Sequence, residues 1–278
     1  MESIDLSKID LELQALLRKT GKYVVDEFKH FTYKEVKFKG DNDPFTYVDV
    51  TTEEILKKGC AGLIPGSGFI TEETAAEEGE NAYTWIIDPI DGTANFTHGI
   101  PHFCISIALT YEGETVMGHI YHPVLDQMYV AIKGKGFNLD GETMKVSQRK
   151  DLREGVLGTG FPYAHHSWVP DYLGLVADLH QASHGFRRFG SAALDLAYVA
   201  CGRLDGFFEF QLNSWDIAAG ALMVEEAGGK ITDFSGGDGY LSKRGTIASN
   251  AYVHEDIQKA IEARGFADRF HELEESKS

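Results

Sequence analysis

Apolar side chains in the first thirty residues recur at intervals of three and four positions. Leu6, Ile9 and Leu13 begin a stripe that lies on one side of the chain when it is wound as a helix. We therefore predict a first helix from about residue 6 to residue 28. The next stretch, residues 34–44, is polar and contains Gly, Asn, Asp and Pro, which is typical of a mobile surface loop or an irregular hairpin.

A second helix and a set of strands follow. Thr51 and Glu54 have the spacing of a capping box, which predicts a helix from Thr51 to about Cys60, with Asp49 just before its first turn. Short β-rich apolar runs bounded by turn residues then predict strands. These runs cover residues 68–71, 83–87, 102–111, 115–121 and 127–132. We expect them to form a sheet with several antiparallel neighbours.

The pattern changes after Asp140-Gly141, a dipeptide typical of a hairpin turn. From there, predicted strands alternate with predicted helices. The strands cover residues 156–159, 186–189, 204–210 and 246–249, and the helices cover 169–181, 191–201, 216–227 and 254–264. A more α/β-like half therefore begins near residue 145. We expect an N-terminal part, 1–144, and a C-terminal part, 145–278, within one compact unit.

The composition is that of a globular protein, because 43% of the 278 residues are hydrophobic and 25% are charged. The charge is less ordinary. There are 26 Lys and Arg against 43 Asp and Glu, which gives a formal net charge of −17. This surplus argues against nucleic acid or an anionic membrane as the main partner. A small anionic substrate would also be repelled unless cations were fixed at its site.

The cysteines and the apolar runs bear on localisation. Cys60, Cys104 and Cys201 are widely spaced and odd in number, so they suggest reduced thiols rather than a disulfide framework. No secretory signal pattern begins the chain, and no apolar run approaches the roughly 18 residues of a membrane span. We therefore expect a soluble protein of the cytoplasm.

One segment combines features of a metal site. In Trp85-Ile86-Ile87-Asp88-Pro89-Ile90-Asp91-Gly92-Thr93, an apolar strand runs into two carboxylates three residues apart and then into a small-residue helix start. Backbone N–H groups at such a start suit an oxyanion, which would not tolerate two nearby carboxylates without a cation between them. Because the set contains no His or Cys, a hard cation such as Mg²⁺ is favoured.

The same residues also have an ordinary interpretation as turn and capping residues. Two more segments weigh against it. Glu72 and Glu73 end another strand-like run, and Asp216 stands at the start of an Ala-rich helix. Each alone is more often a helix cap or a solvated acid, but together they supply acids from three segments that could converge. Sequence motifs for nucleotide-binding glycine loops, HExxH zinc sites and GxSxG nucleophiles are absent.

With these motifs, the sequence resembles the inositol monophosphatase family of Mg²⁺-dependent, lithium-sensitive phosphatases. The resemblance rests on WIIDPIDGTANF and NSWDIAAGALMVEEAGG, with FTYVD, ITEE and GSAALDLAYVACGRLDGFFE in the family's order and spacing. It implies an α/β (α+β) fold of alternating helix and sheet layers, of the inositol monophosphatase and fructose-1,6-bisphosphatase type. It also implies an active site between the two halves, and members of the family are commonly homodimers.

The resemblance further implies specific metal ligands. Glu72, Asp88 and the Ile90 carbonyl would hold a first Mg²⁺, and Asp88, Asp91 and Asp216 would hold a second. A third, weaker ion is the open alternative.

The resemblance assigns other roles close to these ligands. Asp49 and Thr93 would orient the attacking water in catalysis, beside Glu72. The backbone at Gly92 and Thr93 would bind phosphate. Lys39 would lie on a mobile loop near the metals.

Substrate recognition is expected in the second half of the chain, with Asp216 also close to the substrate. Glu209 matches the family's glutamate that contacts a sugar-like hydroxyl, although a solvated strand position is an equal alternative. Ser191 and Ala192 match a turn that contacts inositol, although Ser191 also has the character of a helix cap. Thr71 stands where the family usually has Gly, and its β-branched side chain restricts the backbone that leads to Glu72.

These implications favour Mg²⁺-dependent hydrolysis of a small polyol phosphate monoester, with myo-inositol 1-phosphate first. Fructose 1,6-bisphosphate, histidinol phosphate and nucleotide 3′-phosphates are alternatives on the same fold. A different class of alternative is a regulatory binding protein of the transcription machinery.

Overall fold

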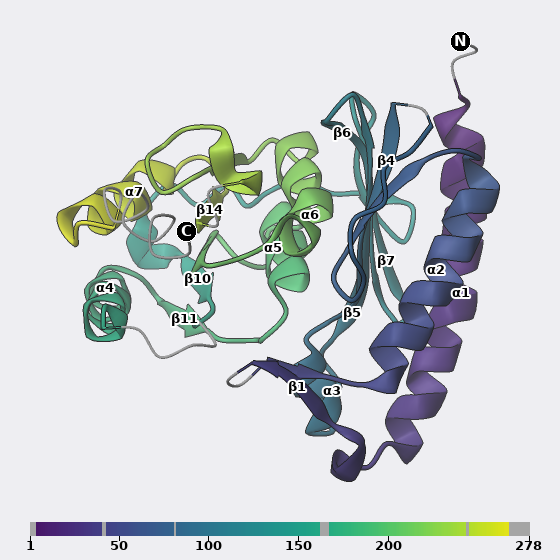
Figure 1. The fold of residues 1–278 in the computed structure, drawn as a ribbon. Helices are drawn as coiled ribbons and strands as arrows, with labels where there is room; N and C mark the ends of the chain where they lie inside the picture. Colours follow the sequence, from purple (N-terminus) through teal and green to yellow (C-terminus); the bar gives the residue numbers. More distant parts are fainter. Residues whose placement is uncertain (1–3, 41–42, 81, 162–166, 243–244, 267–278) are drawn as a thin grey trace.

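The computed structural model of the chain describes residues 4–40, 43–80, 82–161, 167–242 and 245–266. Helices and sheets alternate as stacked layers (Figure 1). The helices are α1 (Leu6–His30), α2 (Tyr47–Leu63), α3 (Thr93–Thr97), α4 (Val169–Ala182), α5 (Ala192–Ala200), α6 (Ser214–Glu226) and α7 (His254–Ala263), with single 3₁₀ turns at Tyr33–Glu35, Leu152–Glu154 and Gly239–Leu241. None of the helices in these ranges combines the length and the apolar character needed to cross a bilayer.

The first sheet has seven strands in sequence order. They are β3 (Gly68–Thr71), β4 (Tyr83–Asp91), β5 (Cys104–Tyr111), β6 (Glu114–His122), β7 (Gln127–Ile132), β8 (Gly136–Leu139) and β9 (Glu142–Thr143). Strand β3 is parallel to β4, and every later neighbour is antiparallel. The expected antiparallel sheet is thus confirmed, but β4 continues four residues beyond its expected end, as far as Asp91.

The second sheet has five strands in the order β11-β10-β12-β14-β13. Their bounds are β10 (Val156–Thr159), β11 (Gly185–Arg187), β12 (Gly206–Phe210), β13 (Lys230–Thr232) and β14 (Gly245–Ser249). Strand β10 is parallel to both of its neighbours, whereas the other pairs are antiparallel. Strand β13 was not predicted, because three residues carry too little pattern. The polar stretch near residue 40 forms the irregular hairpin, β1 (Lys37–Gly40) with β2 (Asp43–Phe45).

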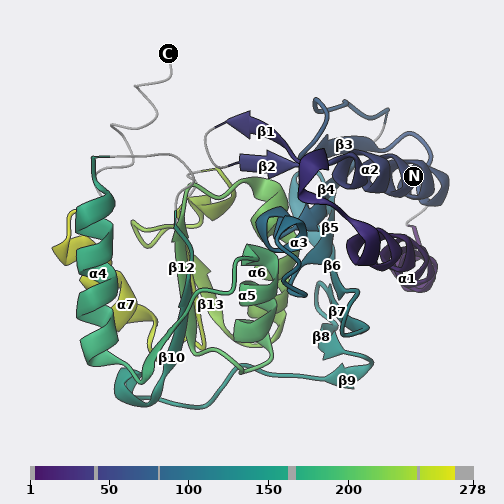
Figure 2. The same ribbon diagram turned by 90° about the horizontal axis from the view of Figure 1, so that it is seen from below.

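Alternating side chains of the first sheet build two different hydrophobic cores. In β5, Ile105 and Ile107 belong to the core shared with α1 and α2, while Cys104 and Ala108 belong to the core shared with α5 and α6. A third core lies between the second sheet and helices α4 and α7. The result is five layers, from α1 and α2 through the first sheet, α5 and α6, and the second sheet to α4 and α7 (Figures 1 and 2).

The start of α2 corrects the sequence interpretation. The capping box is formed by Thr46 and Asp49, not by Thr51 and Glu54, so the helix begins at Tyr47 and Asp49 lies in its first turn. Both pairs have the same spacing. The earlier pair prevails because starting there places Val48 in the core beneath α2. This shift matters for the site, because it fixes the Asp49 side chain by its own helix start.

A buried aspartate fastens the connection between the two sheets. Asp205 is 0% exposed, and its carboxylate accepts hydrogen bonds from the Ser147 hydroxyl, from Arg149 Nη1 at 3.0 Å, from the Val156 N–H at 2.8 Å and from Asn250 Nδ2 at 3.4 Å. The connecting segment after residue 145 is thereby attached to the second sheet. The functional division at this point, with metal ligands before it and specificity residues after it, stays a prediction.

Candidate metal and phosphate site

An irregularity in β4 brings two aspartates to the same side of the sheet. Asp88 pairs with Ser106 of β5, and Asp91 pairs with Cys104, so three steps along β4 match two steps along β5. In a regular strand, residues three apart point to opposite faces, but one extra residue in a bulge restores the same face. The bulge therefore places both carboxylates together at the end of the strand.

The third aspartate comes from the second half of the chain. Asp216 lies in the first turn of α6, where its Oδ2 accepts a hydrogen bond from the Asn213 N–H at 2.6 Å as part of a capping box. Carboxylate oxygens of Asp88, Asp91 and Asp216 all lie within 4.8 Å of one another. The structure thus brings together three of the predicted metal ligands from segments more than 120 residues apart.

The electrostatics of this group are unfavourable without a cation. Burial raises the pKa of Asp88 well above its usual range, and the charges of Glu72, Asp91 and Asp216 raise it further. Burial and the charge of Asp91 do the same for the pKa of Asp216, and burial raises the pKa of Asp91 to about 6. Oxygen ligands that repel each other in a partly dry site fit a hard divalent cation such as Mg²⁺.

Glu72 and the Ile90 carbonyl, the other two predicted ligands, lie beside this group. Glu72 follows β3, which runs parallel to β4, and its side chain is hydrogen-bonded to that of Asp88. Thr71 is buried inside β3 and is not among the described residues with positive φ, so its β-branched side chain fits the backbone there. The Ile90 carbonyl accepts a hydrogen bond from Thr93 Oγ1 at 2.9 Å.

Asp49 and Thr93 form the expected pair. The Thr93 hydroxyl lies 3.0 Å from Asp49 Oδ1. The other oxygen of Asp49 accepts from the N–H and hydroxyl of Thr46, at 2.8 and 2.6 Å. Burial raises the pKa of Asp49 to about 6, although these hydrogen bonds lower it. Gly92, which precedes Thr93, has φ +97°, a conformation that glycine adopts without strain, and it starts the five-residue helix α3.

Helix α5 closes the site from the second half. The Ser191 hydroxyl and the Ala193 N–H both donate to Asp91 Oδ2, each at 2.7 Å. Ser191 is also the N-cap of α5, as the capping alternative predicted. Its hydroxyl is therefore already engaged within the protein. Substrate contact by Ser191 and Ala192 stays a prediction.

Two other predicted residues lie at the edge of this arrangement. Glu209 lies on β12, and the residue is partly exposed. Withdrawal of its carboxyl from solvent raises the pKa of Glu209 to about 8. The charge of Arg188 lowers this pKa, and the charge of Asp91 raises it. Lys39 lies on β1, but its side chain is outside the described part of the structure.

Three supporting residues were missed by sequence reasoning. Thr46 holds Asp49, and the threonine-to-aspartate spacing could have revealed it. Buried Glu53 accepts hydrogen bonds from the Glu73 N–H and the Thr74 hydroxyl, at 2.8 and 2.6 Å, next to Glu72. Asn95 Nδ2 donates to the carbonyls of His102 and Phe189, which no local pattern could reveal because Phe189 lies 94 residues away.

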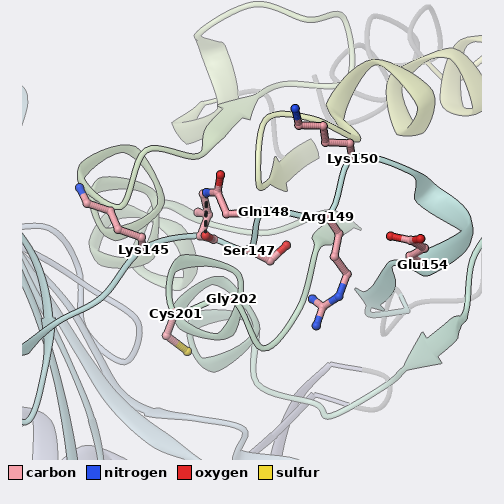
Figure 3. Close-up of a pocket in the computed structure, with 9 residues that line it drawn as sticks. Lys145, Ser147, Gln148, Arg149, Lys150, Glu154, Cys201 and Gly202 are labelled. Carbon is pink, nitrogen blue, oxygen red and sulfur yellow. Dashed lines mark hydrogen bonds between the residues drawn. The ribbon is translucent and has the colours of Figure 1, made fainter.

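A separate cleft of about 620 Å³ lies near the connection between the sheets (Figure 3). Lys145, Arg149 and Lys150 line it, together with Ser147 and Cys201, and none of the predicted site residues does. The three cations do not converge, because Lys145 and Lys150 point away from Arg149, which is paired with Asp205 (Figure 3). This cleft is not a built anion site.

Comparison with known proteins agrees with the fold. The model of the Inositol monophosphatase family matches residues 5–265. An inositol-1-monophosphatase of Mesorhizobium japonicum is 39% identical over 91% of this chain and 95% of its own, and a Nus factor SuhB of Pasteurella multocida is 38% identical over 88% and 92%. The crystal structure of extragenic suppressor protein suhB from Bartonella henselae superposes with a TM-score of 0.87, at 38% identity over 91% and 98%.

The family match and the solved neighbours indicate a phosphatase. The chain belongs to the inositol monophosphatase family. Members of this family use Mg²⁺, and the aspartate cluster could bind a metal ion.

Proposed function

We propose that this protein hydrolyses the phosphate monoester of a small polyol, with myo-inositol 1-phosphate as the leading substrate. The observation that carries this proposal is the convergence of Asp88, Asp91 and Asp216 beside the hydrogen-bonded pair of Asp49 and Thr93. Backbone N–H groups hold each of the three acids, but their carboxylate oxygens still lie within 4.8 Å of one another, where their charges repel. They lie next to a hydroxyl and a carboxylate that can position a water molecule.

The residues present fit Mg²⁺. Glu72, Asp88 and the Ile90 carbonyl would hold one ion, and Asp88, Asp91 and Asp216 would hold another, with a third left open. Bound there, Mg²⁺ supplies positive charge for the phosphate oxygens and lowers the pKa of a water molecule. It would also cancel the repulsion that a net charge of −17 imposes on an anionic substrate.

The protein's own groups provide orientation. The Thr93 hydroxyl has one proton, which is shared between Asp49 Oδ1 at 3.0 Å and the Ile90 carbonyl at 2.9 Å, so its lone pairs remain available to accept a hydrogen bond from the attacking water. Asp49 can then receive a proton near neutral pH, since its pKa is raised to about 6. The Thr46 hydroxyl donates to the other Asp49 oxygen and so fixes the orientation of the carboxylate towards Thr93. The backbone at Gly92 and Thr93 would bind the phosphate.

Recognition of the alcohol would fall to the second half of the chain. Glu209 can accept a hydrogen bond from a polyol hydroxyl, and the segment at Ser191 and Ala192 would contact the ring. Lys39 would approach from the β1-β2 hairpin. The name of the Mesorhizobium relative supports inositol 1-phosphate as the first ester to test.

The test is phosphate release from a panel of esters at neutral pH. It would compare myo-inositol 1-phosphate with fructose 1,6-bisphosphate, histidinol phosphate and a nucleoside 3′-phosphate, each in EDTA, in Mg²⁺, and in Mg²⁺ with Li⁺. We expect turnover with Mg²⁺ only, inhibition by Li⁺, and the highest kcat/KM on the inositol ester. An Asp91→Asn protein with full activity would sink the proposal.

A second function is favoured by the names of other relatives, several of which are Nus factor SuhB proteins. We propose binding to the transcription machinery as a second role. Immobilised protein would be tested for retention of purified RNA polymerase, with Asp88→Asn as the matched variant that lacks turnover. Retention by both proteins supports a binding role that does not need catalysis, and retention by neither rejects it. A homodimer is also proposed, which light scattering after size exclusion would test.

A further inference from the structure

Arg188 occupies a position beside the active-site wall that no proposed role uses. It lies just after β11, two residues before Gly190, and its side chain is exposed. A Cβ atom at Gly190 would meet Arg188 Nη1 at 2.8 Å, so the guanidinium rests directly over this glycine. Its Cζ lies 5.9 Å from the centre of the Phe161 ring, a cation–π distance. The side chain is thus held from two sides.

The surroundings of Arg188 connect it to the alcohol end of the site. Gly190 is followed by Ser191, whose hydroxyl bonds to Asp91, and the Gly190 carbonyl accepts a hydrogen bond from Asn95. Arg188 also opposes the raised pKa of Glu209, so its charge is felt at the proposed hydroxyl acceptor. Among the described residues, no carboxylate lies within ion-pair distance of Arg188. The guanidinium thus lies against Gly190 on an exposed side chain, without a described carboxylate partner.

We infer that Arg188 is a specificity residue that admits esters whose leaving group carries a second anionic group, a carboxylate or a phosphate. The inference rests on the proposed hydrolysis, and it adds a second class of alcohol, one with an anionic substituent, to the neutral polyol.

Charge balance explains why one cation matters here. Asp195 and Glu209 are two acids whose carboxyls feel the charge of Arg188. In their ionised forms, both would repel a second negative substituent on the substrate. The planar guanidinium can donate two parallel hydrogen bonds to a carboxylate or phosphate. Arg188 would therefore convert a repulsive pocket into one that accepts such a substituent, while Glu209 still accepts a hydroxyl.

The experiment compares matched pairs of esters that differ in one anionic group. Glycerol 2-phosphate is paired with 2-phosphoglycerate, and fructose 1-phosphate with fructose 1,6-bisphosphate. For Arg188→Ala, we expect kcat/KM on the doubly anionic member of each pair to fall at least about tenfold, with less than a threefold change on its partner. Arg188→Lys keeps the charge but loses the two parallel N–H donors of the guanidinium, so its kcat/KM on the doubly anionic esters should lie between those of the wild type and Arg188→Ala.

Arg187→Ala is the matched control. Arg187 is the neighbouring exposed cation, and its Nη1 donates to the Phe186 carbonyl rather than facing Gly190. It should leave both members of each pair unchanged. If Arg188→Ala lowered kcat/KM equally within each pair, Arg188 would only balance the charge of Glu209, and the inference would be wrong.

Calorimetric binding with Ca²⁺ in place of Mg²⁺ separates this inference from the proposed hydrolysis. If the wild type turns over no ester, hydrolysis fails as a proposal. The role of Arg188 still stands if Arg188→Ala selectively weakens binding of 2-phosphoglycerate by about tenfold. The absence of selective weakening, or of any binding by the wild type, rejects the role.

Discussion

Asp205 and Asp88 are both carboxylates withdrawn from solvent, 0% and 2% exposed, but their surroundings are opposite. Asp205 accepts hydrogen bonds from a serine, an arginine, an asparagine and a backbone N–H. Asp88 accepts one backbone hydrogen bond, from Ile90 at 3.0 Å, and faces the charges of three other acids. The donors around Asp205 stabilise its charge within the fold, whereas the charge of Asp88 requires a bound cation.

The difference separates a structural acid from a functional one in the same molecule. A buried carboxylate with full donors stabilises the chain segments that supply them, because removing it leaves those donors unpaired. A buried carboxylate among like charges destabilises the metal-free fold and is retained for binding. The two aspartates should therefore respond in opposite ways to the same substitution.

The largest effect is expected for Asp88→Asn. Removing this proposed metal ligand should lower kcat/KM on the best ester at least about a thousandfold, since metal-based stabilisation of phosphate charge is worth several kcal/mol. In EDTA, the same variant should unfold at an equal or higher temperature than the wild type, because one repelling charge is gone. Phosphate release and thermal denaturation measure the two outcomes. A less stable variant in EDTA would contradict the comparison.

Asp205→Asn should show the reverse behaviour. The amide keeps one acceptor oxygen but loses the ion pair with Arg149, so we expect the free energy of unfolding to fall by about 3 kcal/mol. Activity per folded molecule should change less than threefold at a temperature where the variant is folded. Urea denaturation, with active sites counted by titration, checks both. Unchanged stability would mean that the hydrogen bonds to Asp205 do not stabilise the fold.

Metal removal tests the site acids as a group. Mg²⁺ at 100 times its dissociation constant should add about 2.7 kcal/mol to the free energy of unfolding, seen as a higher melting temperature than in EDTA. Asp216→Asn should reduce this gain, while Asp205→Asn should keep it. A wild-type melting temperature that is equal in Mg²⁺ and EDTA would count against the site.

The smallest effect concerns Asp195, an acid of α5 that neither role uses. Burial, with the charges of Glu209 and Asp91, raises its pKa well above 3.8. A raised pKa in the folded state means stability that is full at low pH and is lost as pH rises through that pKa. Asp195→Asn should flatten the decline of unfolding free energy as pH rises above 3.8, by about 1 kcal/mol or more. An unchanged slope, measured by urea denaturation, would show that Asp195 does not titrate there.

Much of the fold followed from local patterns. Strands β7 and β10 lie at their predicted bounds, because turn residues mark both ends of each apolar run. The start of α2 was misplaced because two threonine-acid pairs five residues apart carry the same signal. Strand β13 was missed because it consists of three residues supported by β14.

The site was predictable to a different degree. Glu72, Asp88 and Asp91 stand in sequence motifs that can be recognised without the structure, and the structure places them with Asp216 and near the Asp49–Thr93 pair. The residues that hold these acids in place stand in no such motif. Asn95, Ser191 and Asp205 act on partners 45 to 100 positions away, and such pairings depend on how the layers stack.

The bulge in β4 means that the site depends on the number of residues in the chain as well as on their identity. Gaining one residue between Asp88 and Asp91 would turn Asp91 towards α1 and α2, whereas losing one would leave both acids on the same face of a regular strand. An insertion would leave every acid in the sequence and still separate the two side chains. Among homologous chains, an inserted residue at this bulge would therefore indicate a broken site even where all of the acids are present.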